Sequence, residues 1–201
     1  MRWTKWLDLS LAAATLFLCA GAALAAPQNG WWWNSAESGR GFFIESFRND
    51  VVAALPMTQE WVQDNHSRST QGVVRGMHFQ LGDGQAKLIR CARGAICDVV
   101  VDLRPDSGTF AEWEAFVLDD ENLHELYVPV GFAHGFCVIS DLADVVYKCS
   151  SYYDPSSERG FAYNDPEVAI EWPAGLALSA SQRDSRAPLL KEIKSELAFN
   201  Y

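Results

Sequence analysis

Polar and titratable side chains crowd the stretch from Gln63 to Gln80, QDNHSRSTQGVVRGMHFQ. Two histidines, two arginines, an aspartate and an asparagine surround the apolar pair Val73 and Val74. Buried polar groups cost free energy unless each finds a partner, so a plain core strand has no use for so many of them. The stretch therefore indicates either the wall of a ligand cavity or an edge strand whose polar face lies in solvent.

Alternation along an extended strand over 72–80 predicts which side chains would face a ligand together. One face would carry Val74, Gly76, His78 and Gln80. The other face would carry Arg75, Met77 and Phe79. His78 is of particular interest, because an imidazole titrates near neutral pH and suits proton abstraction. Strict alternation separates His78 from Arg75.

The stretch 63–80 resembles the signature of the dTDP-4-dehydrorhamnose 3,5-epimerases, cupin-type β-proteins that act on a nucleotide-linked keto-sugar. Five further segments resemble the family in the family's order, namely KLIRCARGAICDVVVDLR (87–104), LYVPVGFAHGF (126–136), VVYKCSSYYDPSSERG (145–160), NDPEVAIEWP (164–173) and LSASQRDSRAPLL (178–190). The resemblance runs from about Arg40 to the C-terminus, and a match this long and ordered is very specific.

Epimerisation next to a ketone needs no redox cofactor. A base removes a proton, an acid on the other face returns one, and a positive group stabilises the enolate oxygen. The resemblance implies four catalytic residues: His78 as the base, Asp184 as the carboxylate that orients it, Tyr147 as the proton donor and Lys87 as the cation at the 4-keto oxygen. Taken singly, they would be a core histidine, a surface aspartate, a core-edge aromatic and a solvated lysine.

The resemblance also implies a set of substrate-binding residues, namely Arg40, Glu45, Gln63, Asp64, Asn65, Arg75, His134, Tyr153, Glu158 and Arg183. Arginine forks suit pyrophosphate oxygens, and Tyr153 matches the aromatic residue on which the thymine ring stacks. For any one of the charged residues, the ordinary alternative is a solvated face. The chain departs from the family at three places: Val130 replaces a Glu, Arg183 replaces a Lys, and other residues replace the N-terminal strand that pairs across the dimer.

The first residues follow a different pattern. A short basic region with Arg2 and Lys5 precedes an apolar run over 9–24, and small residues up to Ala25 fit a signal-peptidase site. This pattern predicts a signal-peptide-like leader over 1–25, followed by a single jelly-roll epimerase domain over 26–201.

The cellular location is a point on which the sequence features disagree. The leader favours export, as does GWWWNSAESG (30–39), which resembles short motifs of secreted bacterial proteins. The family chemistry instead requires nucleotide sugars, which are made in the cytoplasm. Apolar strand patterns hold Cys91, Cys97, Cys137 and Cys149, which suits buried free thiols in a reducing compartment. Natural fusion, gene mis-assembly and an artificial sequence all remain open.

The composition narrows the choice of partners. A formal net charge of −10 argues against nucleic-acid binding through phosphates, which needs a basic face. The histidines, His66, His78, His124 and His134, include no pair two residues apart, so we expect no catalytic metal. We expect no cofactor, no stable membrane association and, from the resemblance, a homodimer.

Short alternating strands separated by turns predict the fold. One face of the strand over 96–103 would carry Cys97, Val99, Val101 and Leu103, and the other Asp98 and Asp102. Further strands are expected over 109–117, 125–129, 132–139 and 144–149, and helices over 50–55 and 187–197. The pattern predicts an all-β, cupin-like jelly-roll barrel (a double-stranded β-helix) with short peripheral helices.

The resemblance implies an isomerase that converts dTDP-4-dehydro-6-deoxy-D-glucose to dTDP-4-dehydro-L-rhamnose by proton exchange at C3 and C5. This reaction belongs to dTDP-rhamnose and lipopolysaccharide O-antigen biosynthesis. Two alternatives stay open. Relatives act at only one carbon, which leaves a 3- or 5-only epimerase possible. The leader and the Trp triplet favour an inactive secreted sugar-binding module, whereas His78, Asp184, Tyr147 and Lys87 favour the enzyme.

Overall fold

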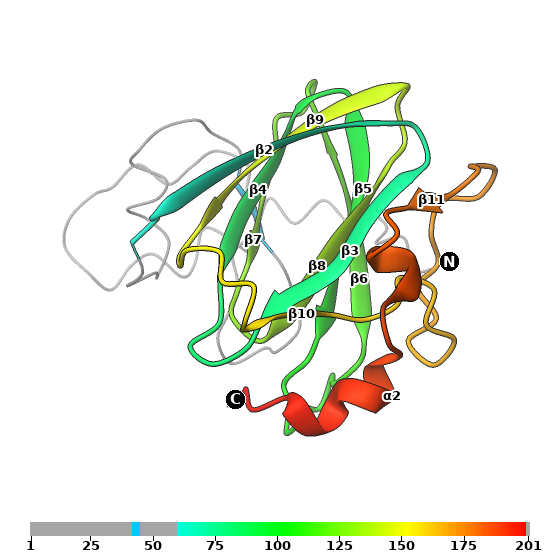
Figure 1. Ribbon diagram of the computed structural model, residues 1–201. Helices are drawn as coiled ribbons and strands as arrows, with labels where there is room; N and C mark the ends of the chain where they lie inside the picture. The colour runs from blue at the N-terminus through cyan, green and yellow to red at the C-terminus, as the bar shows by residue number, and fades with distance from the viewer. Residues whose placement is uncertain (1–41, 45–59, 200–201) are drawn as a thin grey trace, which may run out of the picture.

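The computed structural model describes residues 42–44 and 60–199, whose strands form two sheets packed face to face (Figure 1). Sheet A has the order β1 (Phe42–Ile44), β7 (Glu125–Val128), β4 (Lys87–Arg93), β9 (Leu142–Cys149), β2 (Gln63–Thr70). Sheet B has the order β10 (Glu158–Gly160), β3 (Val73–Gln80), β8 (Phe132–Val138), β5 (Ala95–Asp102), β6 (Trp113–Asp119). The pairings are antiparallel, except that β11 (Ser179–Ala180) runs parallel to β3.

The chain crosses repeatedly from one sheet to the other. From β3 to β5, and again from β6 to β10, each strand lies in the opposite sheet from the strand before it. This crossing brings segments far apart in sequence onto the same inner surface, and it confirms the predicted all-β jelly roll. The predicted leader and the predicted helix over 50–55 lie outside the described residues.

Sheet B is covered on both faces. One core fills the space between the sheets and includes Ile96 and Val100 of β5. A second core lies on the outer face of sheet B, where Val99 and Val101 pack under C-terminal residues such as Ile193. The alternation predicted for 96–103 is therefore confirmed. Because both faces of β5 are buried, its sequence is apolar almost throughout.

Two element boundaries differ from the sequence prediction. The strand expected from Thr109 begins at Trp113, because Thr109–Glu112 forms a turn in which the Thr109 hydroxyl donates to Asp102 at 2.7 Å. The helix expected from Ala187 begins at Leu190, because the residue before Pro188 disfavours helical backbone and Leu189 is extended.

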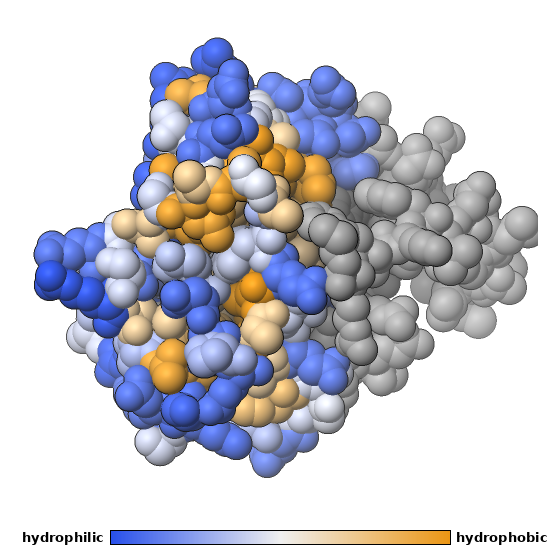
Figure 2. Space-filling model, turned by 90° about the vertical axis from the view of Figure 1, so that its right-hand side faces the viewer, coloured by the Kyte–Doolittle hydropathy of each residue, from blue (hydrophilic) through white to orange (hydrophobic). Residues whose placement is uncertain are grey.

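The helical part of the C-terminus is short. It comprises η2 (Asp184–Arg186), α2 (Leu190–Ile193) and η3 (Lys194–Glu196). The Leu190 N–H donates to buried Asp165 at 2.7 Å, which fixes the start of α2 on the barrel. Figure 2 shows the side of the molecule that carries β11, where apolar residues lie in separate patches among polar ones. Within the described ranges, no helix has the length and apolar character to cross a membrane.

Candidate active site

A bulge in β3 decides which of its side chains face the space between the sheets. Arg75 lies opposite Phe136 and His78 lies opposite His134, with a register shift between them. Directly opposed residues of antiparallel strands point to the same side of the sheet, and Phe136 belongs to the core between the sheets. Arg75 and His78 therefore both face inward. The prediction that alternation separates them was wrong, because the bulge inserts one extra residue.

Two glycines allow β3 and β8 to approach at this bulge. Gly76 has a φ of +127°, and a Cβ on it would lie 2.6 Å from the Gly135 Cα. A Cβ on Gly135 would lie 2.6 Å from the Met77 Sδ. Neither position has room for a side chain, and only glycine adopts such a φ without strain. The close approach places His78 next to His134.

His78 and Asp184 form a hydrogen-bonded dyad. The His78 Nε2 lies 2.7 Å from the Asp184 Oδ1, and the two side chains are 27% and 6% exposed. Burial raises the pKa of Asp184, but hydrogen bonds from His78, Ser181 and Gly76 outweigh it and hold the pKa below its ordinary value. An ionised carboxylate only accepts hydrogen bonds. It therefore fixes the proton of a neutral His78 on Nε2 and leaves Nδ1 free to take up another.

Tyr147 faces the same space from the other sheet. It lies on β9 and packs against the core between the sheets. Burial raises the pKa of its phenol, the neighbouring Cys149 raises it further, and the charge of Arg75 opposes the shift. His78 and Tyr147 thus lie on the inner faces of opposite walls of one barrel.

Lys87 is the first residue of β4 and lies opposite Cys149 of β9. Its side chain is buried. Burial lowers the pKa of the ammonium group, while Cys149, Glu158 and Asp98 oppose the shift electrostatically. The barrel thus places a buried cation on the inner surface shared with Tyr147.

His134 of β8 belongs to a second, more deeply buried dyad. Its Nε2 lies 2.8 Å from the Asp98 Oδ2, and the two side chains are 7% and 0% exposed. Burial lowers the pKa of His134 and raises that of Asp98. The sequence reasoning used Asp98 only for strand alternation and missed this contact. The available signal was a charge in the middle of an apolar strand that is buried on both faces.

Several predicted substrate-binding residues meet beside the dyads. The Arg183 guanidinium lies 2.7 Å from a Glu158 carboxylate oxygen, and the half-exposed Tyr153 hydrogen-bonds to both side chains. The Tyr153 N–H donates to the Gln63 side chain at 2.8 Å, and Gln63 donates to Asn65 at 2.9 Å. Five of the predicted residues therefore form one connected polar group.

Asp64 is a predicted residue that the structure places away from this group. Asp64 alternates with Gln63 and Asn65 to the outer face of β2, where it forms an exposed ion pair with Lys148 at 2.8 Å. The structure therefore does not support a substrate contact for Asp64. Arg40 and Glu45 lie outside the described residues.

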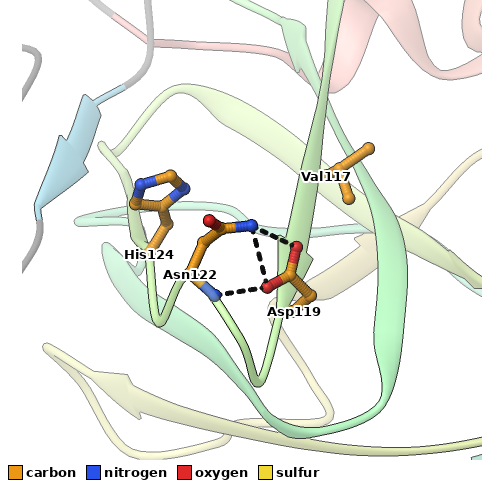
Figure 3. A pocket seen from close by; sticks show the side chains of 4 residues that line it. All are labelled: Val117, Asp119, Asn122 and His124. Carbon is orange, nitrogen blue, oxygen red and sulfur yellow. Dashed lines mark hydrogen bonds between the residues drawn. The ribbon is translucent and has the colours of Figure 1, made fainter.

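A surface hollow of about 480 Å³ lies elsewhere, and its described lining residues are Val117, Asp119, Asn122 and His124 (Figure 3). Val117 and Asp119 lie on β6. Asp119 already accepts hydrogen bonds from the backbone and side-chain nitrogens of Asn122. These described lining residues include none of the predicted catalytic groups.

The fold and these groups define a cupin-type barrel whose inner surface carries a histidine–carboxylate dyad opposite a partly buried phenol and a buried lysine. The sequence profile of dTDP-4-dehydrorhamnose 3,5-epimerase matches residues 33–192, and the chain belongs to this family.

Individual relatives agree with this assignment. The chain is 46% identical over 158 residues to dTDP-4-dehydrorhamnose 3,5-epimerase of Escherichia coli K12, covering 77% of this chain and 84% of the relative. It is 46% identical over 157 residues to dTDP-4-dehydrorhamnose 3-epimerase of Streptomyces niveus, covering 77% and 75%. A crystal structure of dTDP-6-deoxy-D-glucose-3,5-epimerase from Legionella pneumophila with dTDP-4-keto-L-rhamnose matches with a TM-score of 0.74 and 45% identity, covering 80% and 86%.

Proposed function

We propose that this chain is a dTDP-4-dehydrorhamnose 3,5-epimerase. It converts dTDP-4-dehydro-6-deoxy-D-glucose to dTDP-4-dehydro-L-rhamnose, a step of dTDP-rhamnose biosynthesis. The observation that carries the proposal is the His78–Asp184 dyad at 2.7 Å, which faces the inter-sheet space that Tyr147 enters from the opposite sheet. Relatives named as 3,5-epimerases, at identities such as 46%, support the substrate class.

The groups divide the reaction between them. His78 removes a proton from the carbon beside the ketone, and the ionised Asp184 stabilises the imidazolium that forms. Lys87 places its positive charge at the enolate oxygen. Tyr147 donates a proton from the opposite face, so the configuration of the carbon inverts. Solvent then takes the proton from His78 and restores that of Tyr147, and the same cycle serves C3 and C5.

The polar group at Tyr153, Glu158 and Arg183 holds the nucleotide half. Tyr153 is 52% exposed, which leaves a face of its ring on which thymine can stack. The forks of Arg75 and Arg183 suit pyrophosphate oxygens. Arg40 and Glu45 are proposed further contacts. What supports this arrangement is that Gln63, Asn65 and Tyr153 are joined by hydrogen bonds.

Solvent exchange tests the reaction. The chain lacking residues 1–25 is incubated with the 4-keto sugar nucleotide in deuterated water. We expect deuterium at both C3 and C5. Label at only one carbon would identify a 3- or 5-only epimerase, a reaction that the Streptomyces niveus relative makes a real alternative. No label with the sugar still bound would identify a sugar-binding module.

His78→Ala should abolish exchange while dTDP binding persists, because the base is lost and the nucleotide contacts remain. His66→Ala is the matched control: His66 is also a strand histidine 3.1 Å from a carboxylate, that of Asp144, but it lies on the exposed outer face of β2. The His66→Ala variant should exchange solvent deuterium into the sugar at the parent rate. Normal exchange by His78→Ala would show that another group is the base.

A homodimer is the proposed assembly. Its support is β2, an eight-residue strand at the end of sheet A that pairs on one side only among the described strands. Such an edge is a template for pairing with another chain. Light scattering after gel filtration should give twice the chain mass, and a monomer mass would contradict the assembly.

The proposed location is the cytoplasm, where nucleotide sugars are made. The free, buried thiols of Cys91, Cys97, Cys137 and Cys149 support a reducing compartment. We also propose that the epimerase domain begins after residue 25 and that the leader before it stays attached. Fractionation of cells that express the full chain should recover the protein unprocessed in the cytoplasm, and a periplasmic product cut after Ala25 would contradict it.

A further inference from the structure

Lys87, Asp98 and His134 gather on the inner surface of the barrel from three different strands. Asp98 lies between Ile96 and Val100 of the core between the sheets, and its side chain has no exposed surface. Lys87 is 9% exposed. An ammonium group buried to this degree loses its hydration and requires a compensating charge.

The groups that face Lys87 can be compared as sources of that charge. Burial raises the pKa of the Cys149 thiol, so it is uncharged at neutral pH. Glu158 is already paired with Arg183 at 2.7 Å. Burial lowers the pKa of His134, which keeps this ring neutral. Of the described groups that act on Lys87, Asp98 is the carboxylate whose charge remains uncompensated.

The Asp98 carboxylate has capacity left for this role. Its Oδ2 accepts a hydrogen bond from the His134 Nε2 at 2.8 Å, while its buried Oδ1 has no hydrogen-bond partner among the described residues. A buried carboxylate oxygen without a partner is costly unless a positive charge lies near. Burial raises the pKa of Asp98, and the hydrogen bond from His134 and the charge of Lys87 oppose that shift.

We propose that Asp98 is the counter-ion that keeps Lys87 an ammonium ion, so that Lys87 stabilises the enolate and does not condense with the 4-keto group. The inference rests on the proposed function, since it requires the ketone to lie against Lys87. Asp98 is then a positioning residue that acts through Lys87 and not through contact with the sugar.

The avoided reaction has a defined chemistry. A neutral Lys87 amine would attack C4 with its lone pair, the C4–O bond would break, and the oxygen would leave as water while a C=N bond forms. A buried lysine without a counter-ion loses its proton readily and becomes such a nucleophile. An ammonium ion has no lone pair and cannot start this sequence.

Asp98→Asn with reductive trapping tests the proposal. The variant keeps the size of the side chain but removes its charge. With the 4-keto sugar nucleotide and cyanoborohydride at neutral pH, we expect a stable secondary amine on the peptide that contains Lys87, detected by mass spectrometry. The parent chain and Asp98→Asn/Lys87→Met should give none. Absence of the adduct in Asp98→Asn, or an equal adduct in the parent, would overturn the proposal.

Stability provides a second measurement that does not depend on the substrate. Asp98→Asn leaves Lys87 charged and unpaired or forces it neutral, so its free energy of unfolding should fall; adding Lys87→Met should restore much of the loss. If Asp98 served His134 alone, Lys87→Met would add its own loss instead, which would contradict the inference. The proposed function is judged separately, by deuterium exchange in the parent chain. If the parent chain exchanges deuterium and Asp98→Asn forms no adduct, only the counter-ion role of Asp98 is contradicted.

Discussion

At the level of single residues, Tyr147 is the group that turns proton exchange into inversion. Burial raises the pKa of its phenol, so it carries its proton at neutral pH. Tyr147→Phe removes that proton but keeps the ring against the core. His78 should still remove and return a proton on its own face. We expect deuterium exchange to continue while epimerisation falls by about 10²–10⁴-fold, measured by NMR of the sugar protons in deuterated water.

The outcome for Tyr147→Phe separates two roles. If exchange and inversion fall together, Tyr147 is needed to position the sugar and not only to donate a proton. If inversion continues at the parent rate, the acid is another residue. Tyr127→Phe provides a matched control, because burial raises the pKa of this phenol too while Tyr127 lies on β7 opposite Leu88, away from the inner face.

The catalytic residues could be named from the sequence only through the family resemblance. Spacing alone does not link His78 to Asp184, which are separated by 106 positions and meet through tertiary packing. Asp98 carried a signal in the sequence itself, since a charge in the middle of a doubly buried strand requires a partner. The partner, His134, lies 36 positions away and could not be identified without the strand register.

At the level of elements, the bulge in β3 is the feature that side-chain alternation in the sequence did not predict. Alternation was correct along β5, because a regular strand with two covered faces has no freedom of register. It failed between Arg75 and His78, where the backbone geometry depends on contact with Gly135 of another strand. Local spacing cannot report such a contact.

Gly76→Ala tests the role of this bulge. A methyl group there would meet the Gly135 Cα at 2.6 Å, and the φ of +127° is unfavourable for alanine. We expect the free energy of unfolding to fall by about 2–6 kcal/mol, from backbone strain and overpacking together. Exchange activity should fall as well, because the Gly76 N–H hydrogen-bonds to Asp184. Urea denaturation and deuterium exchange measure the two effects.

Gly108→Ala is the control for this substitution. A Cβ on Gly108 would meet nothing within 4 Å, and the residue lies in the turn after β5. Its stability should stay within about 1 kcal/mol of the parent chain. Equal behaviour of the two glycine variants would show that the bulge tolerates a side chain and that its geometry has another cause.

At the level of the whole molecule, ionised carboxylates are spread over both sheets and the C-terminal segment. Hydrogen bonds hold several of their pKa values below the ordinary 3.8, namely those of Asp102, Asp119, Asp144, Asp154 and Asp184. A group whose pKa is lower in the folded state contributes stability above its unfolded pKa and loses it as pH falls through the folded pKa. Asp98 and Glu125 act in the opposite direction, because burial raises their pKa values. Among the described residues the carboxylates with lowered pKa are more numerous, so the free energy of unfolding should decline from about pH 4 downward.

Asp144 gives this acid sensitivity a test outside the proposed active site. A hydrogen bond from Arg68, at 2.8 Å, is the main cause that lowers the pKa of Asp144 to about 2. Asp144→Asn should therefore be less stable than the parent chain near neutral pH, and the difference should shrink as pH falls from 3.8 toward and below about 2, as the parent carboxylate takes up its proton. Urea denaturation across this range measures the effect.

Asp106→Asn, in the exposed turn after β5, is the control, and its stability should stay within about 0.5 kcal/mol of the parent. A stability difference for Asp144→Asn that does not change with pH would show that Arg68 stabilises the barrel by packing and not by charge.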